Sequence, residues 1–98
     1  MNFFEYFRGE VVRIVNQLVD EGRLPKNIET ARISVDSPRE SNHGDITTNA
    51  AMILAKVTGI PPRDLAKLIT EQLNDVEWIS GTDIAGPGFI NMKLNIDF

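Results

Sequence analysis

The sequence contains no cysteine, and this absence removes several kinds of site. Without cysteine the chain can form neither disulfide bonds nor thiolate zinc clusters, and it has no thiol nucleophile. Such a composition fits a reducing compartment, so we expect a cytoplasmic protein. At 98 residues with 42% hydrophobic content, residues 1–98 are predicted to form a single domain stabilised by one hydrophobic core.

Long hydrophobic runs and a surplus of positive charge are also missing. The longest aliphatic stretch, Ala50–Ala55, is far shorter than the ~20 residues that cross a bilayer, and the first residues lack the pattern of a secretory signal. Ten Lys and Arg face fourteen Asp and Glu, which gives a net charge of −4. We therefore expect no membrane and no DNA partner, and any RNA contact must be local or depend on charge supplied by other domains.

Apolar residues at helical spacing predict three helices. The first runs from about Phe3 to Asp20 and is followed by Gly22; the mixed charges of its polar face favour packing against a core over binding to a membrane. Thr47 and Thr48 are expected to cap the second helix, which Gly59 closes. The third helix opens at Pro61–Pro62. The inner stripes comprise Phe4, Phe7, Val11, Ile14, Val15 and Leu18, then Ala51, Leu54 and Ala55, then Leu65, Leu68, Ile69 and Leu73.

Alternation of apolar and polar residues predicts four strands. They are Ala31–Val35 with Ala31, Ile33 and Val35 inward, Asp45–Thr47, Val76–Ile84 with a bulge near Gly81, and Phe89–Ile96. The order is helix, two strands, a helical region and two strands. This order predicts an α+β fold with a mostly antiparallel sheet and helices on one face, which leaves the other face open to solvent or a partner.

The last predicted strand carries the candidate binding residues. Its apolar side, which includes Ile90 and Met92, must face the core, so Phe89, Asn91 and Lys93 point to the outer face. Phe89 offers a ring on which a base could stack, Asn91 a paired donor and acceptor, and Lys93 a phosphate partner. These are the groups needed to recognise an unstacked base.

Spacing alone also allows a structural interpretation of the same segment, and by itself favours it. Phe89 could cover the sheet edge or pack under the preceding loop, while Asn91 solvates the outer face. A tight turn at Gly86, Pro87 and Gly88 needs flexible backbone angles whatever the chain does.

His43, Gly44 and Asp45 invite an active-site interpretation, because His and Asp can form an acid–base pair. No serine, cysteine or second histidine stands in a supporting motif, and the spacing is not that of metal ligands. We therefore predict no catalytic residue and no metal site in this chain. Asp45 and the two threonines are expected to satisfy backbone donors at the start of the second helix, with Gly44 allowing the turn.

Three segments, His43–Lys56, Pro61–Arg63 and Gly86–Asn91, resemble the N-terminal additional domain of arginyl-tRNA synthetases. They occur in the family's order, and together with the amphipathic first helix the resemblance covers nearly the whole chain. It implies a two-layer fold with an antiparallel sheet, which precedes a class I catalytic domain and touches the tRNA elbow. In this family the residues that match Phe89 and Asn91 help to recognise an exposed D-loop base, so the expected partner is the D-loop of tRNA-Arg.

The resemblance also implies what lies outside this chain. The parent would be an arginine–tRNA ligase of protein biosynthesis that uses ATP and Mg, with a linker and the ATP-binding fold following this region. The class I nucleotide motif needs two neighbouring histidines, whereas this sequence has only His43, so the chain alone should neither bind these cofactors nor activate arginine. The alternative is a protein-interaction domain that docks on the catalytic domain, or on another partner, through its open sheet face.

Overall fold

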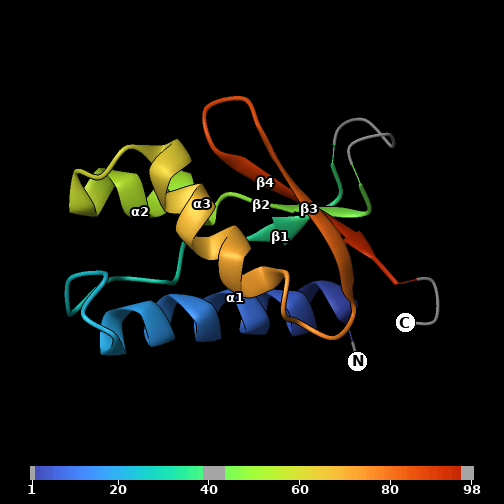
Figure 1. Ribbon diagram of the computed structural model, residues 1–98, viewed down its shortest axis with the longest axis horizontal. Helices are drawn as coiled ribbons and strands as arrows, with labels where there is room; N and C mark the ends of the chain where they lie inside the picture. Colours follow the sequence, from blue (N-terminus) through green and yellow to red (C-terminus); the bar gives the residue numbers. More distant parts are fainter. Residues whose placement is uncertain (1, 39–43, 96–98) are drawn as a thin grey trace.

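The computed structural model describes residues 2–38 and 44–95. In chain order the elements are α1 (Phe3–Asp20), β1 (Val35–Asp36), β2 (Ile46–Thr48), α2 (Ala50–Thr58), α3 (Pro62–Leu73), β3 (Ile79–Ala85) and β4 (Phe89–Leu94). The predicted α+β fold and the order of its elements are confirmed (Figure 1).

The four strands form one antiparallel sheet in the order β1-β2-β4-β3. The last strand of the sequence thus lies inside the sheet, paired with β2 on one side and β3 on the other. Residue Asn91 is opposite Thr47 of β2 and Asp83 of β3. The register shifts between Ile79 and Gly81, which confirms the predicted bulge.

Local signals set the ends of the helices. The Asn2 side chain accepts a hydrogen bond from the Phe4 amide at 2.9 Å and caps α1, whose predicted bounds are confirmed. Gly59 closes α2 with a left-handed φ of 75°, as predicted. Pro62 is the first residue of α3, where its missing N–H costs little.

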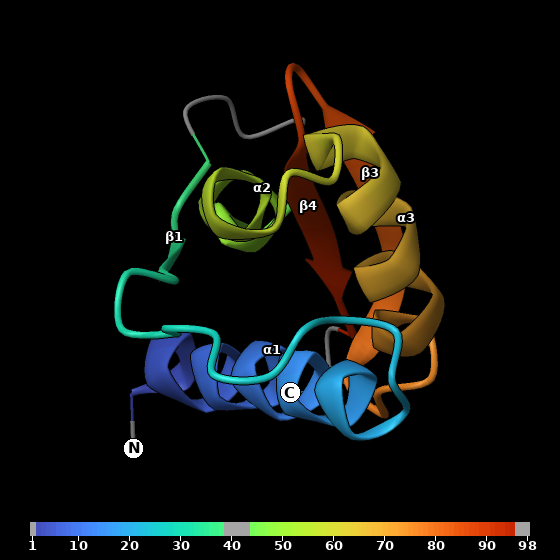
Figure 2. The ribbon, with the colours of Figure 1, turned by 90° about the vertical axis from the view of Figure 1, so that its left-hand side faces the viewer.

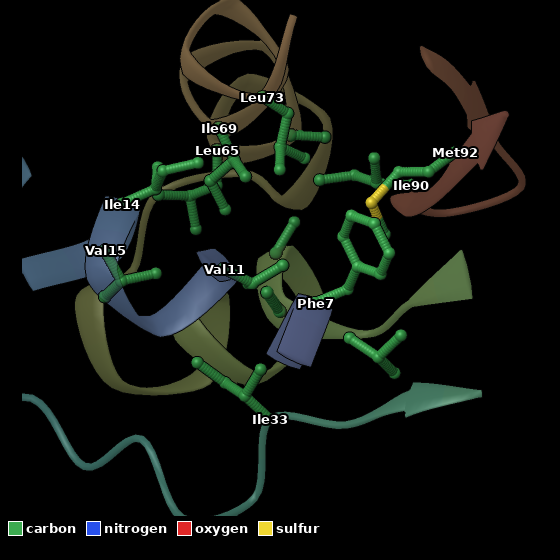
Figure 3. Packing of buried hydrophobic residues seen from close by; sticks show 14 of the residues in the cluster. Phe7, Val11, Ile14, Val15, Ile33, Leu65, Ile69, Leu73, Ile90 and Met92 are labelled. Carbon is green, nitrogen blue, oxygen red and sulfur yellow. The ribbon is translucent and has the colours of Figure 1, made fainter. Parts of the chain in front are cut away.

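The core lies between the helices and the inner face of the sheet (Figure 3). Phe7 and Val11 of α1 meet Ile69 of α3 and the β4 residues Ile90 and Met92, and all five side chains are buried. In Figure 2, α1 runs below the other two helices and the strands, and α2 is seen between β1 and β4. No helix within the described residues is long and apolar enough to cross a membrane.

The predicted strand Ala31–Val35 is wrong over most of its length, because β1 begins only at Val35. Ile33 and Val35 are buried as expected, but Ala31 is exposed. Two distant side chains bond the backbone of this segment in place of a neighbouring strand. Arg8 donates from Nε to the Ile33 carbonyl at 2.7 Å, and Asn49 accepts from the Ser34 amide at 2.8 Å and donates to the Arg32 carbonyl at 3.3 Å.

Three other expectations need smaller corrections. Strand β2 extends to Thr48, so the N-cap of α2 is Asn49, although the Thr48 hydroxyl does accept a bond from the Ala50 amide at 3.3 Å. Strand β3 starts three residues later than predicted, since backbone bonds from Val76 to Leu73 and from Ile79 to Val76 form turns there. Strand β4 ends at Leu94, and Ile96 lies outside the described residues.

Candidate nucleic-acid interface

The outer face of the sheet carries the side chains predicted to form the site. Phe89, Asn91 and Lys93 alternate along β4 with the buried residues Ile90 and Met92. The alternation of the strand places all three side chains opposite Ile90 and Met92, but burial agrees with the predicted exposure only for Phe89 and Lys93, because Asn91 is buried. The three side chains nevertheless differ widely in exposure, and this difference decides what each can do.

The turn before β4 rests on the first turn of α3. Arg63 Nη1 donates a hydrogen bond to the Gly86 carbonyl at 2.5 Å, and the Gly88 amide donates to the Ala85 carbonyl at 3.2 Å. A Cβ on Gly88 would lie 2.9 Å from Pro62 Cβ, and the Gly88 φ of +151° is unfavourable for other residues. The glycine therefore allows the turn to pack closely on Pro62, which fixes the position from which Phe89 projects.

The other end of β4 is held by Gly44 and Asp45. The Asp45 amide donates to the Met92 carbonyl at 2.9 Å, and the Asp45 carboxylate accepts from the Leu94 amide at 2.8 Å. Asp45 thus satisfies a donor of β4, not a donor of α2 as the sequence suggested. Gly44 has a φ of +103°, which confirms that this turn needs glycine. His43 lies outside the described residues.

Contacts made by all three sequence segments therefore converge on β4. The segment with Pro62 and Arg63 positions the turn at the start of the strand, and the segment with Gly44 and Asp45 holds its end. Between these supports lies the strand that carries Phe89 and Asn91. Because β4 is held at both ends, the side chains of Phe89 and Asn91 would lose little conformational entropy when a partner binds.

Asn91 lies on the outer side of the sheet but is only 5% exposed. Its cross-strand neighbours are Thr47 and Asp83. It is therefore not a freely solvated surface residue, which argues against the interpretation that Asn91 only solvates the outer face. Its side-chain amide has no hydrogen-bond partner among the described residues. The amide atoms are not completely covered either, because every fully covered side-chain nitrogen or oxygen in the described residues has a partner. The amide is available to a ligand that approaches from the outer face.

Phe89 is 40% exposed and lines an open pocket of about 420 Å³. The pocket lies between the sheet and α2, and its size is within the range of small-ligand sites. Its other lining residues are Ser34, Asp36, Thr47, Asn49, Met52, Ile53 and Lys56. One part of the Phe89 side chain thus borders this pocket while a large part remains accessible to a partner.

Lys56, which the sequence placed too weakly to select, lines the same pocket as Phe89. Lys93 is exposed on the outer face but lies four residues from Phe89 along an extended strand, about 13 Å away. The structure therefore places Lys56, and not Lys93, in the lining of the pocket that Phe89 borders. The sequence alone could not place Lys56 near the site. Its spacing of four residues from Met52 puts both on one side of a helix, but only the fold shows that this side faces the pocket.

Arg63→Ala should loosen the turn without unfolding the protein. The guanidinium bond to the Gly86 carbonyl is exposed, so we expect a loss of about 1 kcal/mol in the free energy of unfolding and faster hydrogen exchange at the Gly88 amide. Urea unfolding and exchange measured by NMR check this. Arg13→Ala is the matched control, since in the described part of the chain the Arg13 side chain bonds only to Glu10 and Gln17 of its own helix. Equal exchange at Gly88 in both variants would contradict the role of Arg63.

These features define an α+β domain in which the exposed ring of Phe89 and the amide of Asn91 lie on the outer face of the sheet. The chain belongs to the arginyl tRNA synthetase N terminal domain family, whose model matches residues 6–94. The family assignment drawn from the three segments is therefore confirmed.

Curated relatives agree with this assignment. The chain is 45% identical to an arginine–tRNA ligase of Parvibaculum lavamentivorans over 98 residues, which is all of this chain and 17% of that protein. It is 47% identical to an arginine–tRNA ligase of Rhodospirillum rubrum over 95 residues, 97% of this chain and 16% of that protein. The chain thus spans about one sixth of the length of the relatives it matches.

Proposed function

We propose that this chain recognises an unpaired base in the D-loop of tRNA-Arg, as the part of an arginine–tRNA ligase that contacts the tRNA elbow. The observation that carries the proposal is the 40% exposed ring of Phe89 on the outer face of β4, beside the side-chain amide of Asn91, which has no partner among residues 2–38 and 44–95. Ligation of arginine to tRNA with ATP and Mg would belong to the remainder of the polypeptide. Within the described residues, no three His, Cys, Asp or Glu side chains converge on a metal site.

The two groups have complementary tasks in such a contact. Stacking on an aromatic ring stabilises an extruded base by roughly 1–3 kcal/mol and tolerates any base, because every base has a π-face. An amide offers donors and an acceptor to a base edge, so it can distinguish between bases. Asn91 is two residues from Phe89 on the same side of β4, about 7 Å away, which suits a base that stacks on the ring and bonds through its edge.

Charge supports a local role for this chain in a larger enzyme. The net charge is −4, and the exposed outer-face residues Asp36 and Asp83 are acidic while Lys93 is basic. Attraction to the phosphate backbone therefore cannot come mainly from this region. The chain is suited to adding recognition of one base to an affinity that other regions provide.

Phe89→Ala in the full-length ligase should weaken the binding of cognate tRNA by about tenfold or more, because it removes one stacking surface. Filter binding and the KM for tRNA in aminoacylation measure the effect, which should leave the KM for arginine and for ATP unchanged. Asn91→Ala should also weaken binding, and the two losses should be non-additive if both residues contact the same base.

Val57→Ala is the control for Phe89→Ala. Val57 is 62% exposed on α2, and it does not line the pocket, so its loss should leave tRNA binding unchanged. Unchanged tRNA binding by the Phe89 variant would contradict the proposal. If the variant instead altered docking of this region on the catalytic domain, the outer face would be a protein-interaction surface. Amide shifts of β4 and the Gly86 turn on addition of tRNA at low salt provide an independent test of direct contact.

A further inference from the structure

The two methionines within the described residues differ sharply in accessibility. Met92 of β4 is 0% exposed inside the core. Met52 of α2 is half-buried and lines the open pocket that Phe89 also borders. Oxidation of a thioether needs contact between the sulfur atom and the oxidant. A small oxidant that enters from solvent therefore reaches Met52 and not Met92.

The neighbours of Met52 determine what an oxygen atom on its sulfur does. The side chains of Ile53 and Phe89 are apolar parts of the same pocket lining, so they offer a polar oxygen no hydrogen bond. Lys56 also lines the pocket and lies four residues after Met52, which puts both on one side of α2. Its ammonium group donates hydrogen bonds and forms no ion pair in the described part of the chain.

We propose that Met52 is a redox-sensitive modification site, at which oxidation by a hydroperoxide makes the pocket polar and weakens the binding of tRNA. The sulfur lone pair attacks one peroxide oxygen, the O–O bond breaks, and the displaced hydroxide takes the proton of the transferred oxygen and leaves as water. Sulfur loses two electrons and the peroxide gains them. The product is a sulfoxide, which methionine sulfoxide reductases can return to the thioether.

The sulfoxide changes two features of the pocket together. A thioether is a weak acceptor, whereas the sulfoxide makes the same side chain polar, so an apolar wall acquires a hydrogen-bonding group. The new oxygen accepts a hydrogen bond from Lys56, which holds the ammonium group on the surface of α2 and away from an approaching RNA. The effect on tRNA rests on the proposed function, whereas the oxidation of Met52 does not.

The first measurement is the rate of oxidation at each of the two methionines. The full-length ligase is treated with hydrogen peroxide and digested, and the sulfoxides are quantified by mass spectrometry. Met52 should be oxidised roughly tenfold faster than Met92, the internal control, and the two rates should become equal in urea. A rate at Met52 as slow as that at Met92 would overturn the assignment. A difference that persisted in urea would also overturn it, because the fold would then not set the rates.

The second measurement is the KM for tRNA in aminoacylation before and after peroxide treatment. Oxidation should raise this KM by about threefold, and a methionine sulfoxide reductase should restore it. Met52→Leu keeps the volume and the apolar character of the side chain, so this variant should bind tRNA normally and lose the response to peroxide. Met52→Gln carries a permanent amide oxygen, so its KM should be raised without peroxide.

Lys56→Ala tests the hydrogen bond to the sulfoxide. Without this donor, oxidation should raise the KM for tRNA by about twofold or less relative to the untreated variant. Val57→Ala is the control on the same helix, since Val57 does not line the pocket, and it should keep the full response. An equal response in both variants would show that Lys56 does not pair with the sulfoxide.

The outcomes also separate this proposal from the proposed function. If peroxide raises the KM of Met52→Leu as much as that of the unmodified ligase, the proposal is overturned, because other methionines cause the effect. If the oxidised ligase keeps its KM while Phe89→Ala weakens binding, the proposal is overturned and the proposed function stands. If Phe89→Ala binds tRNA normally, the proposed function fails and the link to tRNA fails with it. The oxidation rates then still decide whether Met52 is the modified residue.

Discussion

Phe7→Ala should lower the free energy of unfolding by about 3–5 kcal/mol, the range observed for removal of a buried aromatic side chain. Phe7 is 0% exposed and lies on the face of α1 that packs against the sheet. Figure 3 shows its ring pointing toward Ile90 and Met92 of β4, the strand that carries the candidate site. The loss approaches the total stability of a chain of this size, roughly 5–15 kcal/mol, so urea unfolding of the variant should begin at low denaturant concentration.

Phe89→Ala is the control that separates stability from recognition. The same phenyl group is deleted, but Phe89 projects from β4 and is 40% exposed, so we expect a loss of about 1 kcal/mol or less in stability. The two variants should therefore have opposite profiles: the first unfolds easily, and the second folds normally but binds tRNA weakly. A similar loss of stability in both would mean that the Phe89 ring is part of the core, which would weaken its assignment as a stacking surface.

The helices were the most predictable part of this fold. In α1 the predicted apolar stripe repeats at helical spacing, and residues such as Phe7, Val11 and Leu18 are buried, whereas Phe4 at its start is only partly buried. Both the period and the end signals are local, and the bounds could be predicted to the residue. The alternation of β4 was equally informative, because one of its sides is uniformly apolar.

The segment before β1 could not be predicted in the same way. Its alternating pattern is that of a strand, and Ile33 is indeed buried. Its hydrogen bonds, however, go to the side chains of Arg8 and Asn49, which lie 25 residues before Ile33 and 15 residues after Ser34. A periodicity shows which residues are buried but does not reveal which groups satisfy the backbone, and here the partners are set by tertiary packing.

The candidate site was predictable only in part for a related reason. Strand alternation places Phe89 and Asn91 on the outer face, but the near-complete burial of Asn91 depends on pairing with Thr47 and Asp83 from other strands. The presence of Lys56 in the pocket that Phe89 lines depends on the direction in which α2 leaves the sheet. Both facts are properties of the register and the helix placement, which no local pattern specifies.

Gly44→Ala should lower the free energy of unfolding by about 3 kcal/mol or more, for two reasons that add. Gly44 has a φ of +103°, which strains a residue with a side chain, and an added Cβ would lie 2.8 Å from the Met92 carbonyl oxygen. That oxygen belongs to the backbone of β4 and already accepts the Asp45 amide, so it cannot move without breaking the support for the end of the strand. Thermal or urea unfolding measures the loss.

Gly59→Ala isolates the contribution of the close approach. Gly59 also has a positive φ, +75°, but an added Cβ would meet no atom within 4 Å, so backbone strain alone should cost about 1 kcal/mol. The difference between the two variants measures how tightly the Gly44 segment is packed on β4. Equal losses would show that this contact does not hold the strand. A larger loss at Gly44, with shifted amide resonances at Asn91, would mean that this segment contributes to recognition by positioning β4.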